Sequence, residues 1–221
     1  MPDARDDRAA RFDAAVGLVR KAVPKFRVRV KQESRLMRAL GWLLARAGNP
    51  EFMTDYWTTV GFTTYRPAGA DPCDVVALFH EARHAADAWV LSRPLFFFLY
   101  LLPLPLFPLL LAAGIVLGSW WLAAASAAFL LPLPAPFRAW LEFRAYRVTL
   151  WGRSAQYGED ALSDAELERH VSLFSTGAYY WMLPVRPVVR WAFRRLRDEI
   201  RRDRKADGLC LVAENFMQRR E

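Results

Sequence analysis

An uninterrupted apolar stretch in the middle of the chain most constrains its fold. Residues 95–137 form a run of 43 residues without a charged side chain, whereas the flanking segments are rich in charge. A helix needs roughly 20 apolar residues to cross a bilayer, so this length predicts two membrane spans joined by a tight turn near 114–119. Pro103, Pro105 and Pro108 would kink or break the first arm. A shallow re-entrant hairpin, a single span or a soluble apolar core are the alternatives.

The charges beside this stretch predict how it would sit in a membrane. Arg93 precedes it, and Arg138, Arg144 and Arg147 follow it. Because segments rich in Lys and Arg next to a span stay on the cytoplasmic side, we expect both termini and any site at the base of the hairpin in the cytoplasm. The charged N-terminus has no apolar signal core, so we expect no secretory signal.

The chain is also basic overall. It has 31 Lys and Arg against 23 Asp and Glu, a formal net charge of +8, which suits nucleic acid or an anionic membrane surface. The adjoining apolar stretch favours the lipid bilayer and its anionic lipids as a partner, and we expect no nucleic acid. The most basic segment is a helix over 186–205, where Val188, Trp191, Ala192 and Leu196 are expected to share an apolar face.

Hydrophobic periodicity and turn formers predict an α+β chain that is mostly helical. We divide it into residues 1–92, with a small sheet, the membrane hairpin 93–137, and a helical part 138–221. Asp71 or Asp74 is expected to cap the helix that starts near 74, and Ser163 with Glu166 forms a capping box. The expected helices are 4–22, 33–47, 74–92, 137–152, 163–175 and 186–205; a strand is expected over 25–31 and a strand or hairpin over 55–67.

A short motif lies just before the apolar stretch. The sequence FHEARHAADAW, residues 79–89, contains H-E-x-x-H at His80, Glu81 and His84. Residues four apart share a helix face, so the two histidines can bind one metal ion. Glu81 lies about 100° round the helix, where it can act as a general base. Chance would produce about 0.002 such matches in this composition. The alternative is a pair of surface or capped histidines on an amphipathic helix.

A catalytic zinc site of this kind needs a third protein ligand and one position for water. Asp87 lies roughly on the same face as His84, but a continuous helix carries it away from the metal and predicts a supporting role. We favour Glu142, because a membrane hairpin returns the chain to the surface that it left. The alternative for Glu142 is a surface carboxylate paired with Arg138 or Arg144.

Other residues are candidates for stabilising negative charge on a reacting oxygen. His170, the third histidine of the chain, could be an alternative ligand or an oxyanion donor, although a lone histidine on a helix is more often exposed. Tyr146, Tyr179 and Tyr180 are rival donors. We therefore expect the catalytic residues to be Glu81 with His170 or Tyr146.

The motif and Glu142 resemble the HExxH zinc metallopeptidases, the zincins, and specifically their glutamate-ligand branch, the gluzincins. The resemblance covers about 55–152 and includes a strand before the motif helix, similar to the edge on which zincins bind substrate backbone. It implies a zincin-like catalytic core, Zn²⁺ as cofactor, the ligands His80, His84 and Glu142, and Glu81 as general base. The departure is an apolar helical hairpin inserted between the HExxH helix and the third-ligand helix.

Two functions of different classes follow from these features. The first is a membrane-anchored zinc hydrolase, most simply a metallopeptidase that acts on a protein or peptide. The second is a non-catalytic membrane-interaction protein whose metal site is structural or vestigial. In the second case Glu81 would be dispensable, and a closed site with four ligands, including His170, would be expected.

Overall fold

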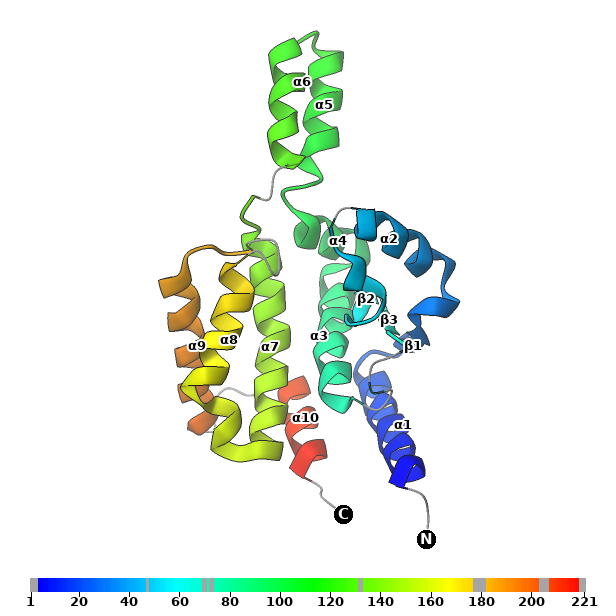
Figure 1. Ribbon diagram of the computed structural model, residues 1–221, viewed down its shortest axis with the longest axis vertical. Coiled ribbons are helices and arrows are strands. Elements are labelled where there is room, and N and C mark those ends of the chain that lie inside the picture. Colours follow the sequence, from blue (N-terminus) through cyan, green and yellow to red (C-terminus); the bar gives the residue numbers. More distant parts are fainter. Residues whose placement is uncertain are drawn as a thin grey trace. The chain divides into compact units, whose positions relative to one another are not determined.

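Figure 1 presents the computed structural model, which describes residues 4–46, 48–68, 71, 74–130, 133–176, 182–202 and 207–218. The chain divides into two compact units: 1–92 with 145–156 and 206–221, and 93–144 with 157–205. The units therefore interleave along the chain. One border between them falls within a continuous helix, α7 (Pro136–Tyr157).

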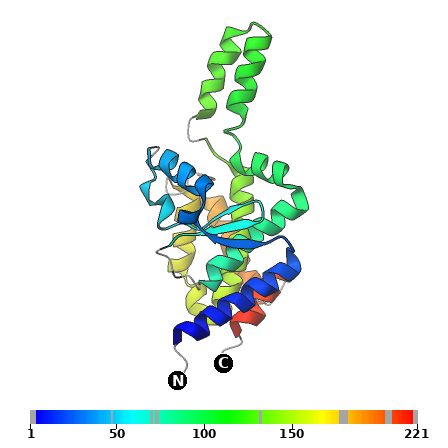
Figure 2. The same cartoon turned by 90° about the vertical axis from the view of Figure 1, so that its right-hand side faces the viewer.

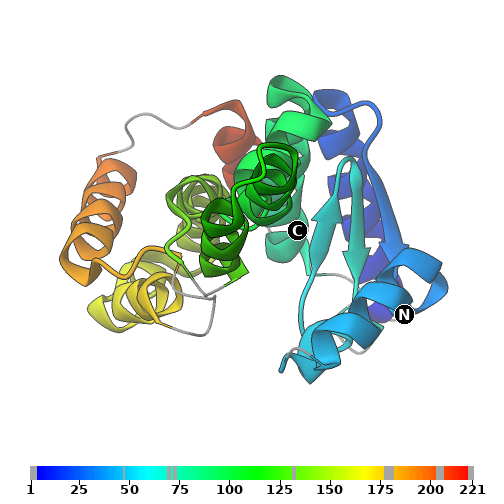
Figure 3. The same ribbon diagram turned by 90° about the horizontal axis from the view of Figure 1, so that it is seen from above.

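A small mixed sheet lies in the first unit (Figure 3). β1 (Arg27–Val30) pairs in parallel with β3 (Thr63–Arg66), and β2 (Thr58–Val60) pairs antiparallel with β3. Of the strand or hairpin expected over 55–67, the structure forms the hairpin. Gly61, with a φ of 63°, opens the two-residue turn between β2 and β3, a conformation that favours glycine. The strand order β1-β3-β2 makes β2 an edge strand.

Besides residues 145–156 of α7, the described part of the first unit contains α1 (Ala4–Ala22), α2 (Arg35–Arg46), α3 (Val75–Leu91) and α10 (Gly208–Gln218). α1, α3 and α10 contact one another, and Figure 2 shows α1 and α10 side by side. α2 covers a separate core cluster that includes Met37, Phe52 and Tyr65. The predicted helices are confirmed here, whereas α10 was not predicted.

The apolar stretch forms short helices in the second unit. They are α4 (Arg93–Leu101), α5 (Leu106–Val116) and α6 (Trp120–Ser126), followed by the 3-10 turn η3 (Ala127–Leu130). Among the described residues, no single helix is both long and apolar enough to cross a bilayer; α4 and α5 meet these criteria only together and are bent by 90° at their junction. The first arm is therefore broken, as the prolines within it led us to expect. Pro103 and Pro105 lie at the bend, where proline interrupts helical hydrogen bonding.

The turn predicted near 114–119 is present and makes α5 and α6 a tight hairpin (Figure 1). A Cβ on Gly114 would lie 2.6 Å from the backbone nitrogen of Ala123, so only glycine permits this approach of the two helices. Gly118 adopts a φ of 64° in the turn itself. The hairpin carries exposed apolar side chains, among them Leu109, Ile115, Val116, Leu117, Trp120 and Trp121.

The rest of the second unit is built on α8 (Asp164–Ser175) and α9 (Arg186–Arg201), which pack against each other. Ser163 accepts a hydrogen bond from the Glu166 backbone nitrogen at 3.4 Å, the first half of the predicted capping box. The predicted apolar face of α9 is wrong in part. Its core side consists of Val189, Phe193 and Leu196, whereas Val188 and Trp191 are exposed.

Candidate metal centre

The motif helix α3 is fixed by a side-chain cap and by its apolar residues. Asp74 accepts a hydrogen bond from the Ala77 backbone nitrogen at 2.9 Å, as expected for a helix N-cap. Leu78, Phe79 and Ala82 are buried in the core of the first unit. Burial of these residues leaves the two motif histidines together on another part of the helix surface. Their ring centroids, those of His80 and His84, lie 5.2 Å apart.

The second element of the site is the helix α7, where Glu142, Tyr146 and Thr149 are spaced four and three residues apart and so share one face. Within the first unit, the hydroxyl of Thr149 lies 3.0 Å from Nδ1 of His80. The ring of Tyr146 stands edge-on to His80 at 4.8 Å between centroids. These contacts hold this part of α7 against α3. Glu142 precedes Tyr146 by one turn on the same continuous helix.

Three residues converge as a possible set of metal ligands. One ligand atom from each of His80, His84 and Glu142 lies within 4.8 Å of the others. His84 is 5% exposed, Glu142 is 3% exposed and His80 is partly buried. Two imidazoles and a carboxylate form a donor set that suits zinc, with a fourth position left for water. The three residues proposed as ligands from the sequence are therefore the three that the structure brings together.

A hydrogen-bond chain selects the nitrogen that His80 would offer to a metal. The hydroxyl of Thr149 donates to the Ala145 carbonyl at 3.3 Å. Its oxygen can then accept a proton from Nδ1–H of His80 across the 3.0 Å contact. That arrangement leaves the Nε2 lone pair available as a ligand, the usual second role of a metal-binding histidine.

Glu81 is next to the two histidines but is not part of the ligand group. Its side chain is buried, and its Oε2 accepts no hydrogen bond within the part of the chain that the structure describes. Its backbone carbonyl accepts a hydrogen bond from the Thr59 hydroxyl of β2 at 3.4 Å. A buried carboxylate oxygen with an open acceptor position beside metal ligands is suited to take a proton.

Charged side chains in the first unit link the motif helix to its neighbours through Arg83. Arg83 lies 3.1 Å from Asp87 and also pairs with Asp207, which caps α10 by accepting from the Cys210 backbone nitrogen. Burial raises the pKa of the Asp87 carboxyl, and the positive charges of Arg83 and His84 oppose that rise. Asp87 thus supports the motif helix through Arg83 and does not belong to the converging ligand group, as the helix geometry predicted.

The other predicted site residues fall into different environments. Tyr146 lies against His80. His170 is buried in α8, where its ring stacks on Phe193 at 5.5 Å and its Nε2 lies 4.0 Å from Glu166. The expectation that a lone helical histidine would be exposed is therefore wrong, and His170 is not among the ligands that converge. Tyr179 and Tyr180 lie outside the described residues.

Sequence reasoning missed two hydrogen-bonding neighbours of the ligands. Thr149 contacts His80. It could have been predicted as a neighbour of the site, because it follows Glu142 and Tyr146 at helical spacing and so lies on the same helix face. Tyr100, at the end of α4, donates a hydrogen bond to Oε1 of Glu142. Nothing in the apolar run that surrounds Tyr100 distinguishes it from a membrane or core residue.

Comparison with known proteins adds no relative. No protein-family model, no curated protein and no solved structure matches the chain.

Proposed function

We propose that the protein is a membrane-anchored, zinc-dependent hydrolase, and specifically a metallopeptidase. The observation that carries this proposal is the convergence of ligand atoms from His80, His84 and Glu142 within 4.8 Å, next to the buried carboxylate of Glu81. The sequence resemblance to gluzincins assigns these four residues the same roles. His80, His84 and Glu142 would hold the zinc ion, and Glu81 would remain free for proton transfer.

In this reaction Glu81 moves one proton in each half of the cycle. Zinc, when bound, supplies a Lewis acid that polarises the carbonyl oxygen and lowers the pKa of a water molecule to about 7. Oε2 of Glu81 accepts a proton from the attacking water as the carbon–oxygen bond forms. It then donates that proton to the amide nitrogen as the carbon–nitrogen bond breaks, so the products are a carboxylic acid and an amine. Tyr146, whose ring lies against His80, is our candidate for donating a hydrogen bond to the substrate oxygen.

A peptide is favoured as substrate by the strand next to the motif. β2 contacts α3, and Thr59 of β2 bonds to the Glu81 carbonyl. As an edge strand, β2 is paired in the described residues with β3 on one side only. An extended peptide can add to such an edge through backbone hydrogen bonds, which brings its amide groups close to Glu81.

The proposed anchor is the α5–α6 hairpin. Its exposed side chains are apolar, and the segment from 94 to 137 carries no charge that would oppose insertion into lipid. Arg93 and Arg138 border the segment, where they could meet lipid headgroups. We propose the cytoplasmic side of the membrane for both termini and for the site.

Zinc content and turnover test the two halves of this proposal separately. We expect detergent-purified wild type to hold about one zinc per chain, and His84→Ala and Glu142→Gln to lose it, because a three-residue donor set tolerates no missing ligand. Glu81→Gln should keep zinc but lose cleavage of fluorescein-labelled casein by a factor of about 10³ or more. The exposed Glu33→Gln is the matched control for both carboxylates and should behave as wild type.

The second candidate is a non-catalytic membrane-interaction protein, favoured by the exposed apolar hairpin independently of any metal. In that case Glu81→Gln changes no measurable activity, and vesicle binding is the same with and without zinc. A wild type that retains no zinc after reloading would leave this second function as the better one.

A further inference from the structure

The uncharged stretch 95–137, called the apolar insert below, contributes a residue to the candidate metal centre. Tyr100 lies in the last turn of α4, six residues before α5 begins and well inside the uncharged stretch. Its hydroxyl donates a hydrogen bond to Oε1 of Glu142, across 42 residues of sequence but within the second unit. The insert is therefore connected directly to the residue proposed as the third ligand.

The ring of Tyr100 is held from two directions. Phe96, one turn earlier on α4 and 2% exposed, stacks on it with 5.7 Å between centroids and an angle of 19° between planes. The guanidinium of Arg138, one turn before Glu142 on α7, lies 5.1 Å from the ring centroid. A cation over the ring draws electron density from the phenol and strengthens its hydroxyl as a donor. These contacts fix the position of the hydroxyl as well as that of the ring.

A hydrogen bond at this place has a specific chemical consequence. Because Oε1 of Glu142 accepts from Tyr100, the carboxylate cannot rotate about its terminal bond without losing that interaction. A ligand held in one orientation loses less freedom when a metal binds, and partners of this kind typically change metal affinity by about 10- to 100-fold. Glu142 is 3% exposed, so solvent offers little replacement for the phenol.

We propose that Tyr100 is a positioning residue for Glu142 and that the apolar insert, through α4, completes the metal site. The inference rests on the proposed function, because it assumes that Glu142 binds the metal. It adds a second role to the insert, which would serve both as membrane anchor and as part of the structure that orients the third ligand.

Zinc affinity of the full-length protein tests this inference. We expect Tyr100→Phe to weaken zinc binding by about 10- to 100-fold in competition with a chelator, since only the hydroxyl is removed. The apoprotein should unfold at the wild-type temperature. Tyr157→Phe is the matched control, because Tyr157 is exposed at the far end of α7, the helix that carries Glu142, and should keep wild-type affinity.

Cobalt supplies a readout that a purely structural role would not change. With Co²⁺ in place of zinc, the visible absorption reports the coordination of the ion, and Tyr100→Phe should alter its intensity while Tyr157→Phe should not. Phe96→Leu removes the stacked ring but keeps the hydroxyl, so it should weaken zinc binding several-fold in the same direction. This second variant keeps the test decisive if Tyr100→Phe does not fold.

The outcomes separate the two proposals. A wild type that binds neither zinc nor cobalt overturns the proposed function and this inference together. A wild type that binds zinc, beside Tyr100→Phe and Phe96→Leu with unchanged affinity and an unchanged cobalt spectrum, overturns the role of Tyr100 alone.

Discussion

Lys31 is an unusual residue in the first unit, because it is a fully buried cation. It lies in the 3-10 turn η1 (Lys31–Glu33), where its ammonium donates to the Phe52 carbonyl at 2.6 Å and lies 3.7 Å from the centre of the Phe52 ring. Burial lowers its pKa from 10.5 to about 8, and the negative charge of Glu81 partly opposes that shift. The charged state of Lys31 is therefore costly in the folded protein.

This burial predicts a dependence of stability on alkaline pH. Between pH 8 and 10.5 the unfolded chain keeps a proton on Lys31 that the folded chain has lost, so the free energy of unfolding rises with pH. The slope from one such group is at most about 1.4 kcal/mol per pH unit. We expect Lys31→Met to lose this part of the slope in urea unfolding at pH 7.5 and 9.5. Exposed Lys21→Met is the control, and equal slopes in wild type and Lys31→Met would contradict the prediction.

At the residue scale, motif spacing predicted the core of the candidate site. His80 and His84 share one helix face because they are four residues apart. Glu142 was predicted as the third ligand because a membrane hairpin returns the chain to the surface that it left. Lys31 and Tyr100 could not be found in this way. Each acts through one contact with a residue distant in sequence, and helical or strand periodicity carries no information about such contacts.

At the scale of elements, α9 shows why a helix face can be misassigned. Its sequence contains two overlapping apolar stripes that share Leu196: one with Val188 and Trp191, the other with Val189 and Phe193. The structure buries the second stripe and leaves Val188 50% and Trp191 60% exposed. Phe193 decides the choice, because it fills the centre of an aromatic cluster; its ring neighbours are Phe143, His170 and Phe174.

The two stripes predict very different losses of stability for two aromatic substitutions on the same helix. Phe193→Ala should lower the free energy of unfolding by about 3–5 kcal/mol, because it opens a cavity among packed rings. Trp191→Ala removes a mostly exposed ring and should change it by no more than about 0.5 kcal/mol. Denaturant unfolding of the two variants beside wild type measures both values, and a larger loss for Trp191→Ala would restore the face expected from the sequence.

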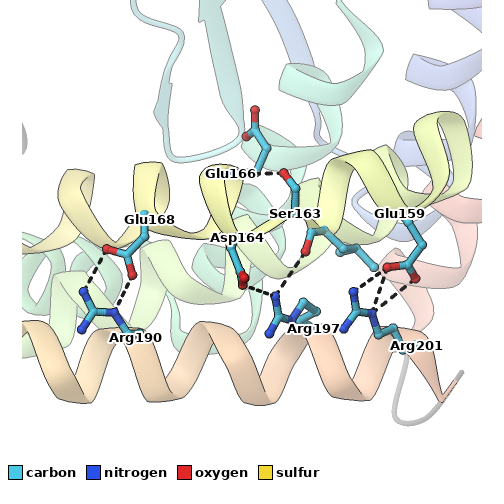
Figure 4. Close-up of polar contacts among 9 residues, drawn as sticks. Glu159, Ser163, Asp164, Glu166, Glu168, Arg190, Arg197 and Arg201 are labelled. Carbon is cyan, nitrogen blue, oxygen red and sulfur yellow. Dashed lines mark hydrogen bonds and ion pairs between the residues drawn. The ribbon is translucent and has the colours of Figure 1, made fainter.

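Ion pairs from α8 and the 3-10 turn before it account for much of the basic charge of α9 (Figure 4). Glu168 pairs with Arg186 and Arg190. Asp164 pairs with Arg197, and Glu159, in the 3-10 turn η4 (Gly158–Leu162), pairs with Arg201. Four arginines of this helix thus meet acidic partners in the same unit. The charge that α9 can offer to anionic lipid is correspondingly smaller than its sequence indicates.

These pairs predict a loss of stability in acid. Hydrogen bonds from Arg190 and Arg186 lower the pKa of Glu168 from 4.5 to about 2. A carboxyl with a lowered folded-state pKa stabilises the protein above its ordinary pKa, and this contribution disappears as the pH falls from 4.5 towards 2. Glu168→Gln should therefore reduce the difference in melting temperature between pH 6 and pH 3. Added salt should shrink the effect, since the pairs are solvent-exposed.

At the scale of the whole molecule, the hairpin and the ligand-bearing helices can be tested independently. Replacement of residues 106–130 by a short Gly/Ser linker removes α5 and α6 but keeps α4 with Tyr100. We expect this variant to lose flotation with phosphatidylcholine–phosphatidylserine vesicles and to retain zinc. Wild type should float, because the exposed apolar hairpin partitions into lipid. Equal flotation of both proteins would assign membrane binding to another surface.

The sequence predicted most helices, the β-hairpin and the turn of the apolar insert, because each depends on local periodicity or on glycine and proline. It did not predict α10, a short helix whose start is marked by a single capping residue, Asp207. Nor could it predict the interleaved units, since the pairing of α10 with α1 and α3 depends on packing between the two ends of the described chain. The break between α4 and α5 was expected from the prolines of the first arm, but the sequence did not specify the 90° bend between the two helices.

The position of α10 bears on how the protein is made. The motif helix α3 is synthesised early, yet Asp207, the partner of Arg83 within the motif, leaves the ribosome more than a hundred residues later. The first unit cannot be completed until that segment has emerged, because α10 packs on α3. A nascent chain would therefore expose an unfinished motif helix throughout translation of the apolar insert, which delays assembly of the metal centre until the insert has left the ribosome.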